Sequence, residues 1–221
     1  MSFKSLSVVL AGLAIAGSAA AAGTWNLAGD YAEAMNPNGA WTYGEVRNGS
    51  FSALAWNAGT HSYGIGQVGE VFIYKRDAAG TDYGIESGEV SLESDWGSAS
   101  VRWTAPTDGV YTFKIDVGGS TASGPGGYGN NFAQYAGVRI NGVDEASGAF
   151  VNNVRGWNFS VNLTAGSTVD TFVLNPGFAS GGNTQTKILV TAVPEPASAL
   201  LLALGIGGLA LRRQRRRTAA A

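Results

Sequence analysis

Cysteine is absent from this chain of 221 residues. Without a thiol the protein forms no disulfide, and both thiol catalysis and cysteine-based metal sites are excluded. Histidine is almost absent too, since His61 is the only one, which excludes a zinc site built from several histidines. A serine triad would have to use His61, and no Gly-x-Ser-x-Gly nucleophile elbow accompanies it. We therefore interpret His61 as a polar loop residue and predict that the protein is not an enzyme.

Basic charge is scarce in the middle of the sequence. Residues 23–193 hold eight of the fourteen Lys and Arg residues and fifteen of the sixteen Asp and Glu residues, which leaves about seven net negative charges there. An acidic surface argues against binding to nucleic acid and to anionic lipid. Acidic residues such as Glu86, Glu89, Glu93 and Asp95 lie in turn-like segments, and we interpret them as solvated surface.

The first 22 residues have the pattern of a secretory signal peptide. Lys4 precedes an apolar run over residues 6–16, and small residues follow up to Ala22. This order predicts cleavage before Gly23 after export by the Sec translocon and signal peptidase. Residues 23–192 would then form one secreted domain, and a domain of that length buries a sufficient core without disulfides.

The pattern of this domain is that of strands. Runs rich in Val, Ile, Thr and aromatic residues alternate with Gly, Asn, Asp and Pro, and no stretch has a convincing helical period. We predict an all-β fold, an antiparallel β-sandwich that is jelly-roll-like. The predicted strands are residues 70–76, 98–104, 110–117, 157–163, 168–174 and 184–193, with a hairpin turn at Asn141-Gly142 and a glycine-rich loop at residues 118–131.

The strand over residues 110–117 has the clearest alternation. Its residues Tyr111, Phe113, Ile115 and Val117 share one face, whereas its polar residues share the other. A half-buried antiparallel strand has this period of two.

The C-terminal segment has three parts in a fixed order. Val193, Pro194, Glu195 and Pro196 come first, and an apolar run over residues 197–211 follows. As a helix, these about 15 residues would cover about 22 Å, less than the roughly 30 Å of a bilayer core. The apolar run would therefore cross the bilayer only together with the residues that flank it. A basic tail ends the segment, with Arg212, Arg213, Arg215, Arg216 and Arg217.

This order resembles the PEP-CTERM protein-sorting signal of Gram-negative bacteria over residues 193–217. The resemblance implies that the protein is exported, that a membrane helix anchors it transiently in the inner membrane, and that an exosortase cuts near Pro194. It also implies a final place at the cell surface or outside the cell, in the context of exopolysaccharide and biofilm. Release and covalent attachment after cleavage both remain open.

Two stretches of the middle domain resemble secreted β-sandwich modules. They are "NPNGAWTYG" at residues 36–44 and "VRWTAPTDGVYTF" at residues 101–113, and the second is similar to a hairpin of galactose-binding-like modules. This resemblance implies a fold and no particular activity.

Aromatic residues are the candidates for a binding site. All six tryptophans and all eight tyrosines lie between residues 23 and 193. A tryptophan face stacks on the apolar face of a sugar ring, and neighbouring Asn or Asp side chains bond the hydroxyls. Trp41, Trp56 and Tyr128 have such polar neighbours, whereas we expect Trp103 and Trp157 to lie in the core.

Two functions fit these patterns. The first is a non-catalytic surface or matrix protein that binds polysaccharide, without a cofactor other than calcium held by loops. The alternative is a secreted hydrolase that acts on polysaccharide through two carboxylates.

Overall fold

Antiparallel strands make up most of the structure. The computed structural model describes residues 23–64, 71–77, 85–94, 97–119, 135–149, 154–174 and 183–194. In these ranges fourteen strands and one short helix, α1 (Leu27–Asp30), follow one another. None of the helical structure in these ranges has the length and apolar content of a membrane span. The predicted signal peptide, membrane helix and arginine tail lie outside the described residues.

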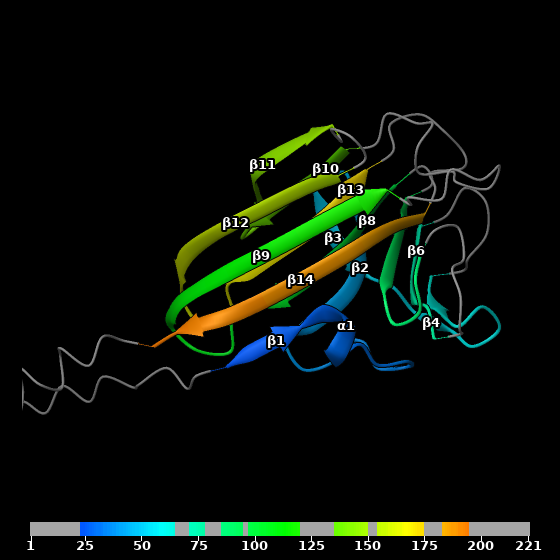
Figure 1. The fold of residues 1–221 in the computed structure, drawn as a ribbon, viewed down its shortest axis with the longest axis horizontal. Coiled ribbons are helices and arrows are strands. Elements are labelled where there is room, and N and C mark those ends of the chain that lie inside the picture. Colours follow the sequence, from blue (N-terminus) through cyan, green and yellow to red (C-terminus); the bar gives the residue numbers. More distant parts are fainter. Residues whose placement is uncertain are drawn as a thin grey trace, which may run out of the picture.

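The strands form two sheets, here called sheet A and sheet B (Figure 1). Sheet A has the order β12 (Val154–Leu163), β9 (Gly109–Gly119), β14 (Asn183–Val193), β7 (Val90–Ser94), β6 (Val71–Lys75), β5 (Ser62–Tyr63) and β4 (Trp56–Asn57), and β1 (Thr24–Asn26) also pairs with β14. Sheet B has the order β11 (Val143–Ala149), β10 (Tyr135–Ile140), β13 (Thr168–Leu174), β8 (Ser98–Thr104), β2 (Trp41–Arg47) and β3 (Ser50–Ala53).

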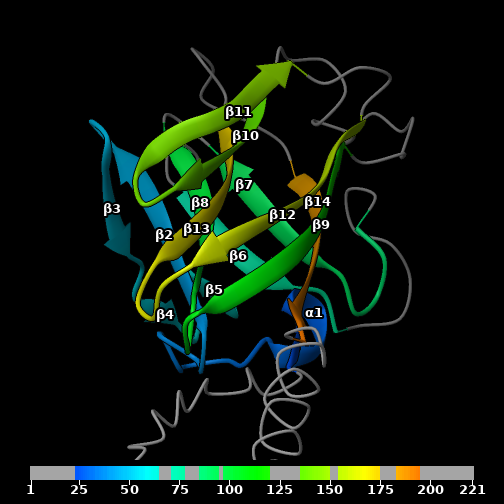
Figure 2. The same cartoon turned by 90° about the vertical axis from the view of Figure 1, so that its left-hand side faces the viewer.

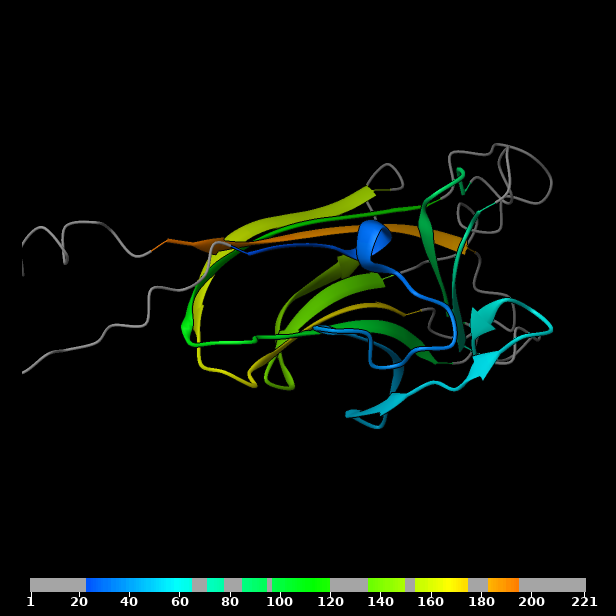
Figure 3. The ribbon, with the colours of Figure 1, turned by 90° about the horizontal axis from the view of Figure 1, so that it is seen from below.

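The two sheets lie face to face and enclose the core (Figures 2 and 3). Aromatic side chains cross between them: the Trp103 ring of sheet B lies 4.8 Å from Tyr111 and 5.3 Å from Phe113 of sheet A, between ring centroids. Phe113 also stacks on Phe159 of the neighbouring strand at 5.2 Å. The predicted all-β sandwich is confirmed.

The alternation predicted for residues 110–117 is confirmed in β9. Tyr111, Phe113, Ile115 and Val117 are buried, whereas Lys114 and the other outward residues are partly or fully exposed. The pairing of β9 with β12 and β14 has a regular register over its length. Because side chains alternate with a period of two, this register directs these four apolar residues into the core.

The predicted hairpin turn joins β10 to β11. Asn141 has a φ of 51° and Gly142 a φ of 83°, and Ile140 pairs with Val143 across the turn. Positive φ at both central residues is the requirement of a type I′ turn, which Asn and Gly meet at low cost. The Asn141 Oδ1 also accepts a hydrogen bond from the Thr168 N–H at 2.9 Å, and this bond ties the turn to β13.

Both ends of the described chain lie at one end of the sandwich. Thr24 pairs with Thr191, and the Ala192 N–H donates to the Gly23 carbonyl at 2.9 Å. Figure 3 shows the start of β1 and the end of β14 side by side, while β4 and β5 lie at the opposite end. The sheet therefore brings together the two points at which the sequence predicts proteolytic cleavage.

The burial of β9 leads to a stability prediction. Phe113→Ala should lower the free energy of unfolding by about 3–5 kcal/mol, because it removes a fully buried ring. Lys114→Ala, on the outer face of the same strand, should cost about 0.5 kcal/mol or less. Urea denaturation of the two variants measures both values, and equal losses would contradict the assignment of faces.

Candidate functional site

Trp41, predicted as a glycan-binding residue, is a core residue. Its side chain is only 1% exposed, and it lies opposite Trp103 in the pairing of β2 with β8. Trp41 and Tyr43 are two residues apart in β2, so both point into the sandwich. The prediction that Trp41 forms an exposed stacking surface is therefore wrong, because a buried indole presents no face to a sugar.

The indole N–H of Trp41 has a structural role. It donates to Asp30 Oδ2 at 3.0 Å, and the same carboxylate oxygen accepts the Asn26 backbone N–H at 2.9 Å. These two bonds connect the start of β2 in sheet B to α1 and β1 beside sheet A. A buried indole N–H needs such a partner, which explains why a carboxylate stands at this place.

Trp56 lies at the surface, at the edge of sheet A. It is half-buried and pairs with Tyr63 in the short hairpin of β4 and β5. Its ring contacts Tyr63 edge-to-face at 5.1 Å and His61 at 6.2 Å, between ring centroids. Contacts on two sides hold the indole in one orientation, so its free surface is preorganised.

A cluster of tyrosines packs on the buried side of Trp56. Tyr63 stacks on Tyr43 at 4.5 Å, and Tyr31 contacts both rings. The Tyr63 hydroxyl accepts the Met35 N–H at 3.1 Å and donates to a carbonyl of the same loop. Burial raises the pKa of Tyr31, Tyr43 and Tyr63, so all three phenols stay neutral at physiological pH.

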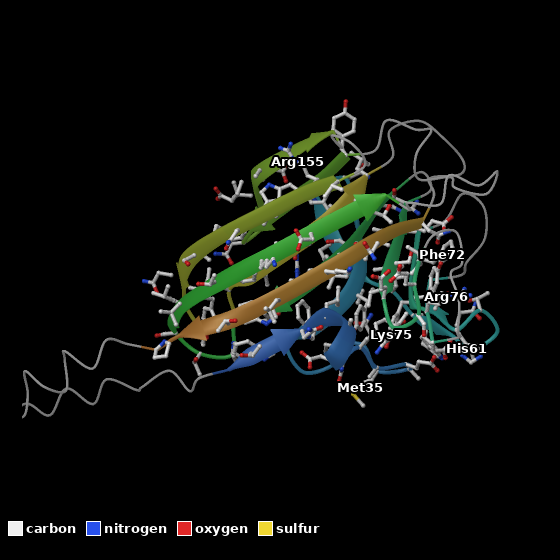
Figure 4. The ribbon with its side chains drawn as sticks, in the orientation of Figure 1. Met35, His61, Phe72, Lys75, Arg76 and Arg155 are labelled. Carbon is white, nitrogen blue, oxygen red and sulfur yellow. The ribbon has the colours of Figure 1, made fainter. Side chains whose placement is uncertain are left out.

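Polar residues lie near Trp56 in the chain and in its hairpin. Asn57 follows it in the chain, and its Oδ1 accepts the Gly59 N–H at 2.9 Å, which shapes the hairpin turn. His61 is 71% exposed and its Nδ1 lies 3.5 Å from Glu33 Oε1. We call Trp56, Asn57, His61 and Glu33 the Trp56 rim. Figure 4 shows His61 and Met35 on this side of the molecule.

Asn36 fixes the loop that carries Glu33. Its side-chain amide donates to the Tyr43 carbonyl at 2.7 Å and to the Leu54 carbonyl at 2.8 Å. Its Oδ1 accepts the Tyr43 N–H at 2.9 Å. One side chain thus ties the loop to β2 and to the segment before Trp56, which explains the asparagine at position 36.

The structure places the other predicted residues differently. Tyr128 and Asp95 lie outside the described residues. Trp103 is buried as predicted, and Trp157 packs against the core while half-buried. His61 lies in the loop between β4 and β5, as predicted. In the described ranges no group of three or more His, Asp and Glu side chains is arranged to hold a metal ion.

Glu89 is not the solvated residue that the sequence predicts. Its side chain is only 12% exposed, and its Oε1 lies 2.9 Å from Lys187 Nζ. Burial by itself would raise the pKa of Glu89, but hydrogen bonds from Lys187, Gln185 and the Glu86 backbone N–H lower it below its usual value. The sequence does not predict this ion pair, because Glu89 and Lys187 are far apart in the chain and meet only through the pairing of β7 with β14.

The C-terminal segment begins where β14 ends. Val193 is the last residue of β14, and Pro194 is exposed beyond it. A family model described as "PEP-CTERM protein-sorting motif" matches residues 192–217. The chain carries a PEP-CTERM sorting signal. This signal implies export and an exosortase as the processing partner, as the sequence predicts.

No curated protein matches the sequence. Among solved structures, a family 35 carbohydrate-binding module from Clostridium thermocellum has 17% identity and a TM-score of 0.33, over 56% of this chain and 92% of the module. A family 6 module of a laminarinase from Zobellia galactanivorans has 14% identity and a TM-score of 0.30, over 55% of this chain and 87% of the module. Pika GITRL has 13% identity and a TM-score of 0.30, over 44% of this chain and 79% of the GITRL chain. These identities and TM-scores are too low to support an assignment of the fold, which rests on the strand pairing described above.

The different burial of two tryptophans leads to a second prediction. Trp41→Ala should lower the free energy of unfolding by about 3–5 kcal/mol, because it empties a core position and leaves Asp30 without its indole partner. Trp56→Ala should cost only about 1–2 kcal/mol, since its ring is only partly buried. Thermal melts of both variants, followed by circular dichroism, test this difference. If the Trp41→Ala variant has the same melting temperature as the wild type, Trp41 is not a core residue.

Proposed function

We propose that the protein is a non-catalytic surface or matrix protein that binds polysaccharide at the Trp56 rim. In this proposal an exosortase processes the exported protein, and the β-sandwich then lies at the cell surface or in the extracellular matrix. The partly exposed Trp56, held between Tyr63 and His61 with polar neighbours, is the observation that carries the binding function.

The position of the sorting signal supports this arrangement. The signal leaves the sandwich at the end of β14, whereas β4, which carries Trp56, lies at the opposite end (Figures 1 and 3). A domain that is held at its C-terminal end would therefore present the Trp56 rim away from the membrane. A matrix polymer reaches a rim in this position without steric conflict with the lipid surface.

The chemistry of the rim suits a sugar. An indole face covers the C–H groups of a sugar ring, and the Asn57, His61 and Glu33 side chains offer donors and acceptors for hydroxyls. Affinity would come from the indole face and neutral hydrogen bonds rather than from charge. Binding to a neutral polymer should therefore depend only weakly on salt.

The hydrolase alternative needs two carboxylates on opposite sides of a glycosidic bond. The acidic side chain that the structure places at the rim is Glu33, which is exposed and lies against His61. Among the described residues the rim has this one carboxylate, whereas hydrolysis needs two. The rim therefore favours binding over hydrolysis.

A first experiment tests the sorting. Replacement of Pro194, Glu195 and Pro196 by alanine should leave the protein uncut in the inner membrane, because a continuous helix would replace a segment that the prolines keep extended. Intact-mass spectrometry of the membrane and extracellular fractions measures the change. Release of a correctly cut product from the variant would refute exosortase processing at this motif.

A second experiment tests the binding. The purified protein should bind polysaccharide extracted from the matrix of the producing cells, and Trp56→Ala should weaken this binding about tenfold. Tyr135→Ala is the matched control, because Tyr135 is another exposed aromatic residue but lies in β10 of sheet B. Microcalorimetry at two salt concentrations measures affinity and salt dependence together. Equal affinity of the Trp56→Ala variant and the wild type would refute the proposed site.

A further inference from the structure

β14 changes its partner halfway along one of its sides. The side facing β9 is paired over its whole length, from Thr184 to Val193. On the other side, Asn183–Thr186 pair with β7, and Leu189–Thr191 pair with β1. Lys187 and Ile188 have no ladder partner there, so a gap opens between the end of β1 and the start of β7. Because successive residues of a strand direct their backbone groups to opposite sides, one of these two residues presents its N–H and C=O to this gap.

A hollow of about 350 Å³ lies at this junction. We call it the β14 hollow. Its walls come from residues 186–189 of β14, Asn26 and Ala28 beside β1, Glu89 before β7, and Lys114 and Asp116 of β9. Figure 1 shows β1 and α1 running alongside β14 at this place. The volume lies at the lower end of the range of small-ligand sites, which suits a single sugar unit.

Two walls of the β14 hollow are fixed by hydrogen bonds. Glu89 bonds Lys187 through Oε1 at 2.9 Å and the Glu86 N–H through Oε2 at 3.0 Å, so both of its oxygens have partners. On the side of α1, the Lys75 Nζ donates to the Ala28 carbonyl at 2.6 Å and holds the helix against the sheet. Figure 4 labels Lys75 beside α1. These contacts preorganise the hollow.

Lys114 and Asp116 add an ammonium group and a carboxylate to the lining of the hollow. They lie two residues apart on the outer face of β9 and are both exposed, and Asp116 lies directly opposite Lys187 of β14. Gly156 of the neighbouring β12 leaves room for the carboxylate, since a Cβ there would lie only 3.1 Å from Asp116 Oδ1. An ammonium group donates and a carboxylate accepts, so the pair can bond adjacent hydroxyls of one ligand.

We propose that the β14 hollow binds a neutral sugar unit, with Lys114 and Asp116 on neighbouring hydroxyls. Leu189, 38% exposed, and Ala28 would contact the C–H groups of the ring. The two lysines and the two carboxylates of the hollow balance each other, so the charge favours a neutral unit over a uronic acid or a phosphate.

This inference rests on the proposed polysaccharide binding and adds a second site to it. β7, β6 and β5 separate β14 from β4 in sheet A, so the β14 hollow and the Trp56 rim are distinct. Two weak sites on one domain can engage one polymer at once. The second contact is then intramolecular, and the combined affinity exceeds that of either site.

The test titrates the purified full chain with glucose, galactose and mannose, and separately with glucuronate and galacturonate, by microcalorimetry. At least one neutral sugar should bind, and the uronates should bind more weakly. Lys114→Ala and Asp116→Asn should each weaken the binding of the neutral sugar about 3- to 10-fold. Glu145→Gln is the charge-matched control, because Glu145 is exposed in β11 of sheet B, and it should change nothing.

Several results would overturn the proposal. They are the absence of binding of every neutral sugar, tighter binding of the uronates, and equal affinity of the wild type and the Lys114 and Asp116 variants. Thermal melts show whether each variant is folded, and two variants keep the test decisive if one of them is not. If the matrix polysaccharide binds through Trp56 while the Lys114 and Asp116 variants bind it normally, the β14 hollow is refuted and the proposed function stands. If Trp56→Ala has no effect either, both assignments fail.

Discussion

The pairing of β1 with β14 is the constraint on which the rest of the structure depends. Three residue pairs, from Thr24–Thr191 to Asn26–Leu189, tie the beginning of the domain to its last strand. Trp25 of β1 then reaches the core, where its ring lies 5.3 Å from Trp103 of sheet B. α1 follows directly, and Asp30 at its end bonds the Trp41 indole. A short strand thus connects both sheets and closes the sandwich.

The same pairing arranges the surface for function. It places the two points of predicted cleavage at one end of the sandwich and leaves the Trp56 rim at the other. On the same side of β14, β1 pairs only with Leu189–Thr191 and β7 pairs only with Asn183–Thr186. The unpaired stretch between them forms the β14 hollow. The start of the sorting signal and the proposed Trp56 site therefore lie at opposite ends of the domain, which would suit a module that is held at one end.

The two tryptophans Trp41 and Trp56 show how strand register decides the role of an aromatic residue. Both have polar neighbours in the sequence, and both fit the pattern of a sugar-stacking residue. Trp41 begins a central strand and alternates inward with Tyr43, whereas Trp56 lies in a two-residue strand at the edge of sheet A. At an edge, one face of a ring has no neighbouring strand to cover it. The spacing of Trp41 and Tyr43 by two residues was the signal in the sequence that could have identified Trp41 as core.

The sequence by itself determined the fold class, the faces of β9, the Asn141-Gly142 turn and the sorting signal. Each of these depends on residues close together in the chain: a period of two, a pair of residues that tolerate positive φ, and a contiguous motif. Only the tertiary structure decided that Trp41 is buried, that Glu89 pairs with Lys187, and that β1 and β7 share one side of β14. Those features depend on strands that are far apart in the chain, and pairing between distant strands is set by the packing of the whole core rather than by any local pattern.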